Sequence, residues 1–142
     1  MIRLRTLLVV TCLVTGTPLL HSAGPNPQAA HPLVGTWTWT LFGGSCNETF
    51  QYRANRTLLG SSGQEVVEKN YEVTAAADAQ GFYRVLETVI RQNDKQNCSG
   101  ATPDAAGEQT TRFIQYSPQL DKLLICESAS LAACYGPLRR VD

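Results

Sequence analysis

LVGTWTWTL, the sequence of residues 33–41, decides the fold of this chain. Large apolar side chains occupy every second position from Trp37 to Leu41, and threonines occupy the positions between them. This period of two is that of a β-strand that buries one face. The stretch therefore predicts a first strand over about 33–42, with Trp37 and Trp39 on the buried face.

Further stretches with the same character follow along the chain, and turn signals separate them at short intervals. The predicted strands cover about 46–53, 57–60, 64–75, 82–92, 110–117, 122–127 and 134–141. Strands joined in order by mostly short loops favour an up-and-down sheet, and eight of them suffice to close it. We therefore expect an all-β fold, an eight-stranded antiparallel up-and-down barrel that forms one domain over 33–142.

The N-terminal residues are expected to lie outside the barrel. Two arginines precede an almost wholly apolar or small run over 6–20, and His21, Ser22 and Ala23 follow it. This order is typical of a secretory signal peptide, which we assign to 1–23 with cleavage after Ala23. Residues 24–32 form a proline-rich arm. The apolar run is too short for a membrane span of roughly 20 residues, so we expect no stable membrane anchor.

Four cysteines follow the signal peptide: Cys46, Cys98, Cys126 and Cys134. An even number in a small exported domain indicates two disulfides and a periplasmic or secreted location. The loops of an up-and-down barrel alternate between its ends, which places all four cysteines at one rim with the longest loop, 93–109. Cys126 and Cys134 flank one predicted hairpin, so we favour Cys126–Cys134 with Cys46–Cys98 over the two other pairings. Zinc is a poor alternative without a Cys-x-x-Cys spacing, and we expect neither metal nor cofactor.

Charge and residue types argue against several function classes. The formal net charge is 0 and no basic stripe is present, which argues against nucleic acid as a partner. His31 is the one histidine after the signal peptide and precedes the barrel, so a Ser-His-Asp triad lacks its base. Oxidised cysteines supply no thiolate nucleophile. Glu48 and Glu87 remain, but an inward carboxylate is more often half of a structural ion pair, here with Arg84, Arg112 or Arg140. We therefore expect no catalytic residues and no enzyme.

Aromatic side chains are the candidates for lining a ligand cavity: Trp39, Phe50, Tyr52, Tyr71, Phe82 and Phe113, with Tyr116. The same side chains can instead fill the core, as the size of the chain favours. The loop over 93–109 is the best candidate for a recognition surface, because long loops on a rigid scaffold often carry function.

The first and the last predicted strands carry a recognisable pair of motifs. Gly35-x-Trp37 at the start and Arg139 or Arg140 at the end resemble the calycin group, in particular bacterial lipocalin-like domains. The resemblance implies that Gly35 and Trp37 seal the closed end of the barrel. It also implies that Arg140, or Arg139, covers the indole as a cation–π contact. These are then closure residues and not ligand residues.

Together these observations predict a monomeric, exported, non-enzymatic lipocalin-like protein that binds a small apolar ligand at the cysteine-bearing mouth. The alternative is a periplasmic protein-binding module, such as an inhibitor of an exported protease or other hydrolase. Periplasmic metalloprotease inhibitors are similar in an early Gly-x-Trp, a cysteine soon after it and an N-terminal arm, here 24–32. An envelope stability factor without a ligand is the third reading. A cavity of a few hundred cubic ångströms at the 93–109 rim favours the carrier, and a filled core favours the inhibitor.

Overall fold

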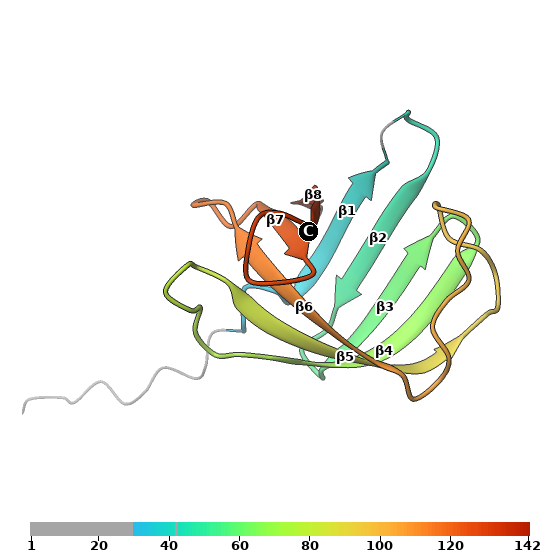
Figure 1. Cartoon of the computed structure of the whole chain (residues 1–142), viewed down its shortest axis with the longest axis horizontal. Coiled ribbons are helices and arrows are strands. Elements are labelled where there is room, and N and C mark those ends of the chain that lie inside the picture. The colour runs from blue at the N-terminus through green and yellow to red at the C-terminus, as the bar shows by residue number, and fades with distance from the viewer. Residues whose placement is uncertain (1–29, 42) are drawn as a thin grey trace, which may run out of the picture.

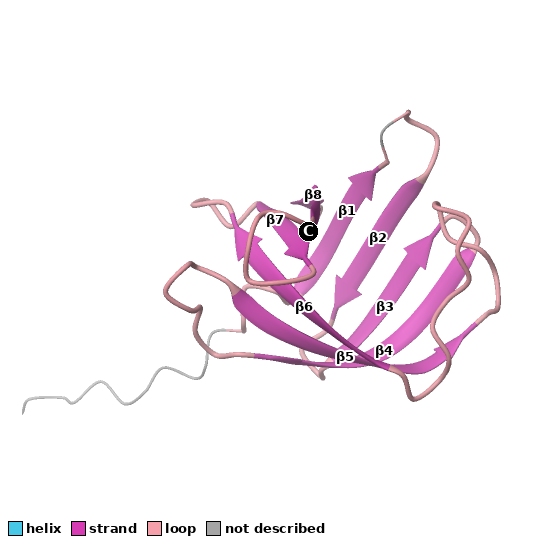
Figure 2. Ribbon diagram, in the orientation of Figure 1, coloured by secondary structure: helices cyan, strands magenta, loops and turns pink. Residues whose placement is uncertain are grey.

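The computed structural model describes residues 30–41 and 43–142. The predicted signal peptide, most of the arm and Phe42 lie outside the described residues. The described chain is all-β, and its strands form a closed antiparallel barrel in which each strand pairs with its neighbours in sequence and β1 pairs with β8 (Figures 1 and 2). The strands are β1 (Gly35–Thr40), β2 (Asn47–Tyr52), β3 (Thr57–Ser62), β4 (Glu65–Val73), β5 (Tyr83–Gln92), β6 (Gln109–Tyr116), β7 (Lys122–Cys126) and β8 (Cys134–Arg140). Within this part of the chain, no helix has the length and apolar character needed to cross a membrane.

The inner face continues from strand to strand in register. Trp37 lies opposite Phe50, Phe50 lies opposite Gly60, and Gly60 lies opposite Val67. A Cβ on Gly60 would come within 2.9 Å of Val67 Cγ1, so the missing side chain lets its neighbours pack closely. Because side chains alternate between faces, this register also turns Trp39 inward.

The barrel closes through a short seam between β1 and β8. Two residue pairs form its ladder, Trp37 with Arg140 and Thr38 with Arg139. Beyond them, the backbone amide of Val141 donates to the carbonyl oxygen of Thr36 at 3.0 Å. A ladder this short gives the seam few hydrogen bonds, so the side chains around it carry much of the closure.

Arg140 is the side chain that covers the indole of Trp37, with its guanidinium carbon 4.3 Å from the ring centroid. Its nitrogens also donate to three backbone carbonyl oxygens, those of Pro32, Val34 and Leu120. Gly35 adopts a φ of +142° beneath it, and a Cβ at Gly35 would collide with Arg140 Nη1. Gly35 is thus required both by its backbone conformation and by the close approach of the guanidinium. Arg139 is exposed.

The closed half and the middle of the barrel are filled by side chains. Trp37 is fully buried, and its Nε1 donates to the carbonyl oxygen of Leu33 at 3.0 Å. The buried core cluster consists of Leu33, Trp37, Tyr52, Leu58, Tyr71, Val85, Ile114, Leu123, Ile125 and Leu138. Trp37 is the largest fully buried side chain among the described residues, so it is the main packing element of the closed end.

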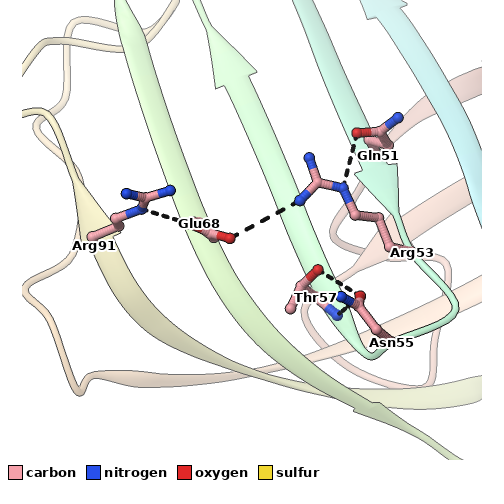
Figure 3. A network of polar contacts seen from close by, with 6 residues as sticks. All are labelled: Gln51, Arg53, Asn55, Thr57, Glu68 and Arg91. Atoms are coloured by element: carbon pink, nitrogen blue, oxygen red, sulfur yellow. Dashed lines mark hydrogen bonds and ion pairs between the residues drawn. The ribbon is translucent and has the colours of Figure 1, made fainter.

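Polar side chains on the outer face of the sheet bond to one another. A chain of contacts crosses β2 to β5 through Gln51, Arg53, Glu68 and Arg91 (Figure 3). Arg91 Nε donates to Glu68 at 2.5 Å, whereas Arg53 Nη1 lies 4.0 Å from Glu68. At the β2–β3 turn, Asn55 Oδ1 accepts from the amide and the hydroxyl of Thr57. Ion pairs at the surface contribute about 0–1 kcal/mol each, so these contacts add little to the stability of the barrel.

Replacing Trp37 with alanine should lower the free energy of unfolding by about 3–5 kcal/mol, because it removes a fully buried indole and leaves a cavity. Urea denaturation monitored by circular dichroism measures the change. Trp39→Ala is the matched control, since this ring is only half-buried on the same strand and its loss should cost clearly less. Equal costs for the two variants would contradict the assignment of Trp37 to barrel closure.

Candidate functional site

The four cysteines form two disulfides at the mouth of the barrel, in the favoured pairing. Cys46–Cys98 joins the start of β2 to the β5–β6 loop, and Cys126–Cys134 closes the β7–β8 hairpin. The first bond spans a sequence separation of 52, for which the chain-entropy model gives a stabilisation of roughly 4 kcal/mol. Two intramolecular disulfides indicate an oxidising compartment.

The β5–β6 loop, residues 93–108, runs along the mouth-side ends of β3 and β4 (Figure 1). The side-chain amide of Asn93 donates to the carbonyl oxygen of Gln64 at 2.8 Å, and the Gln64 amide donates to the carbonyl oxygen of Gln96 at 3.2 Å. The amide of Cys98 donates to Ser62 Oγ at 3.0 Å. The predicted recognition loop is therefore fixed to the β3–β4 hairpin by hydrogen bonds as well as by a disulfide.

A cavity of about 350 Å³ opens at this mouth. The inner faces of β1 to β4 form most of it, and Asn97 of the loop reaches its edge. Phe50 and Val67 supply apolar surface, while Trp39 and Tyr135 supply a second wall with their ring centroids 5.6 Å apart. Buried side chains thus fill the middle of the barrel while the mouth retains a cavity, so the interior is neither wholly filled nor wholly hollow.

One row of inward residues crosses the cavity and carries two carboxylates. Trp39 lies opposite Glu48, Glu48 opposite Ser62, and Ser62 opposite Glu65. Ser62 Oγ donates to Glu48 Oε1 at 2.6 Å while it accepts from the Cys98 amide. This relay holds the Glu48 carboxylate in place from the loop.

Glu65, the second carboxylate of the row, is partly desolvated. Burial raises the pKa of Glu65, the Lys69 charge opposes that rise, and the Glu48 carboxylate adds to it. The side-chain amide of Asn97 opposes the rise more weakly than these. The effects of burial and of the Glu48 charge on the pKa of Glu65 therefore outweigh the attraction of Lys69.

Lys69 and Glu87 form an ion pair at the inner end of the cavity. Lys69 Nζ lies 2.9 Å from Glu87 Oε2, and the two side chains are 17% and 8% exposed. Tyr52 donates its hydroxyl hydrogen to Glu87 Oε1 at 2.9 Å. Burial, and then the Glu87 charge, raise the pKa of Tyr52 well above its usual value. The charge of Lys69 is therefore already matched by a carboxylate that is itself hydrogen-bonded.

The expectation of arginine partners for the inward carboxylates is wrong. Glu87 pairs with Lys69, and Glu48 accepts from Ser62. Position explains the outcome for two of the three arginines: Arg84 is exposed and Arg140 belongs to the seam. The third, Arg112, is half-buried on β6. Burial and then the Glu87 charge raise the pKa of Tyr135, and the Arg112 charge opposes that rise.

The aromatic candidates separate into several environments. Trp39 and Phe50 line the mouth cavity. Tyr52 is buried among the core residues next to Glu87. Tyr71 lies toward the closed end, where its hydroxyl donates to the carbonyl oxygen of Arg53 at 2.8 Å. Tyr52 and Tyr71 pack edge to face with their ring centroids 5.1 Å apart, so both rings belong to the core between the mouth and the closed end.

The remaining candidates do not line the mouth cavity. Phe113 is half-buried next to Ile114, which is fully buried, so the alternation of β6 turns Phe113 to the outer face. Phe82 is buried just before β5, where its amide donates to the side chain of Asp78 at 2.8 Å. Tyr116 packs against Trp37 at the closed end, with ring centroids 5.9 Å apart.

Several lining residues were absent from the sequence prediction: Ser62, Glu65, Lys69 and Tyr135. A usable signal exists for Lys69, because it occupies the same alternation face of its strand as Val67 and Tyr71. A lysine on a buried face requires a partner, and Glu87 carries the corresponding signal between Val85 and Val89.

A second hollow of about 450 Å³ lies at the closed end, beside His31, Arg56 and Tyr71. His31 packs edge to face on Tyr83 at 5.0 Å, and burial followed by the Arg56 charge lowers its pKa. Besides His31, Arg56 and Tyr71, the described lining of this hollow consists of small and apolar residues, and it contains no carboxylate. The mouth cavity, with its carboxylate row and aromatic wall, is therefore the candidate site.

Comparison of the chain with family models, curated proteins and solved structures found no significant match. The fold itself is a closed eight-stranded antiparallel barrel, which is consistent with a calycin-like architecture. Among residues 30–41 and 43–142, no group of three or more His, Cys, Asp or Glu side chains is arranged to hold a metal ion.

Removing the cation of the buried pair should destabilise the protein more than removing both charges. Lys69→Met leaves Glu87 buried without its partner, which costs about 3–5 kcal/mol. In Lys69→Met/Glu87→Gln the amide oxygen still accepts from Tyr52, so part of that loss should be recovered. Chemical denaturation of the wild type, both single variants and the double variant gives the coupling energy. Additive losses would show that the two charges do not interact.

Proposed function

We propose that this chain is an exported, lipocalin-like binding protein that holds a small ligand in its mouth cavity. The observation that carries the proposal is the cavity itself, whose volume of about 350 Å³ lies within the usual range of ligand sites, about 300–1,000 Å³. Its lining combines apolar and aromatic surface with a few convergent polar groups, as ligand sites do.

The construction of the mouth supports a pre-formed site. The Cys46–Cys98 disulfide and the hydrogen bond from the Cys98 amide to Ser62 fix the loop at the edge of the cavity. Because little has to be ordered when a ligand enters, the entropy cost of binding is small. The ligand's apolar body would lie against Phe50, Val67 and the Trp39–Tyr135 wall.

Binding of the neutral fluorophore N-phenyl-1-naphthylamine tests this proposal. We expect saturable binding with enhanced dye emission, because the cavity removes the dye from water. Val67→Phe places a ring in the cavity and should abolish saturable binding. Val66→Phe is the matched control: Val66 is the neighbouring residue, but it is 45% exposed on the outer face, so binding should persist.

Circular dichroism of both variants establishes that they are folded. Dye binding that survives in folded Val67→Phe, or that is lost equally in both variants, would place the dye elsewhere. Absence of saturable binding to the wild type would count against a small-ligand carrier altogether.

A further inference from the structure

The cavity contains more negative than positive charge. Two of its lining residues are carboxylates, Glu48 and Glu65, and the one lining cation is Lys69, which is occupied by Glu87. Glu48 receives a hydrogen bond from a neutral hydroxyl, which supplies no counter-charge. No described salt bridge involves Glu48 or Glu65, so these two carboxylates face the cavity without a cation of their own.

The two carboxylates lie on either side of a single position in the row. Glu48 on β2 and Glu65 on β4 both pair with Ser62 on β3. Neighbouring strands are about 4.8 Å apart, which places the backbones of β2 and β4 roughly 10 Å apart. One compact cationic group between them is within reach of both carboxylates. Burial is the largest cause of the raised pKa of Glu65, and the nearby Glu48 carboxylate adds to that rise.

The remaining wall of the cavity is aromatic. Trp39 is adjacent to Glu48 in the same row, and its ring is tilted by 38° against Tyr135. The face of an indole attracts a cation, and aromatic surfaces combined with nearby carboxylates are a known way of binding quaternary ammonium groups. Such a group also buries methyl surface, which Phe50 and Val67 favour.

We propose that the mouth cavity selects small organic cations, amines or quaternary ammonium groups attached to an apolar body. The charged head lies between Glu48 and Glu65 and against Trp39, and the apolar body extends toward Phe50 and Val67. This inference rests on the proposed binding function and names the class of its ligand.

Three probes of nearly the same shape test the charge preference: benzyltrimethylammonium, its neutral carbon analogue 2,2-dimethylpropylbenzene, and the anion phenylmethanesulfonate. Quenching of tryptophan fluorescence and titration calorimetry report affinity. The cation should bind at least about tenfold more tightly than the neutral probe, as a partly screened attraction at a few ångströms predicts. Its affinity should fall as salt is added.

Isosteric variants locate the charge. Glu48→Gln and Glu65→Gln should each weaken binding of the cation by about tenfold and leave the neutral probe unaffected. Glu72→Gln is the matched control, because Glu72 lies on the same strand as Glu65 but is exposed on the outer face. Its affinity should equal that of the wild type.

The outcomes separate the two proposals. If N-phenyl-1-naphthylamine and the neutral probe bind but the cation does not bind more tightly, the cation preference is wrong and the carrier stands. Tighter binding of the anion, or a loss in Glu72→Gln equal to that in the other variants, overturns it as well. If no probe binds, both proposals fail together.

Discussion

The contact of Arg140 with Trp37 is the interaction on which the rest of the barrel depends. A closed sheet has no free edge, but here the strands that close it share a ladder of two residue pairs. Arg140 covers the buried indole and donates to three carbonyl oxygens at the closed end. Gly35 leaves room for this guanidinium. The seam therefore relies on one arginine, one tryptophan and one glycine that lie near opposite ends of the described chain.

The packed closed half contrasts with the mouth of the barrel, whose interior contains a cavity and charged side chains. The core cluster fills the closed half and the middle, and packing there supplies most of the stability. The mouth instead retains an open volume and inward charges, which are costly to desolvate. Its two disulfides and its hydrogen-bonded loop offset that cost by constraining the chain where packing is absent. Most of the packing and the proposed binding site thus lie in different halves of one barrel.

Much of the fold was predictable from the sequence because the signals are local. Alternation marks each strand, and counting strands places the four cysteines at one rim. The charged interior was harder to predict, because it depends on register. The pairing of β4 with β5 shifts register between Glu68 and Lys69, so that Lys69 lies opposite Val89 and its Nζ contacts Glu87 Oε2 at 2.9 Å. Alternation marks Lys69 and Glu87 as charged residues on buried faces, but their pairing depends on the register of β4 against β5. The direction of Phe113 depended on a one-residue choice of face.

Hydrogen exchange of the two indole N–H groups tests the division of the barrel most directly. The chain has two tryptophans, one in each half. Trp37 donates its Nε1 hydrogen to Leu33 inside the sealed end, whereas Trp39 lines the open cavity. In deuterated water, the NMR signal of the Trp37 indole should persist until the barrel opens, and that of Trp39 should disappear far sooner. Assignment follows from Trp39→Phe. Similar exchange rates for the two indoles would contradict a sealed half and an open half.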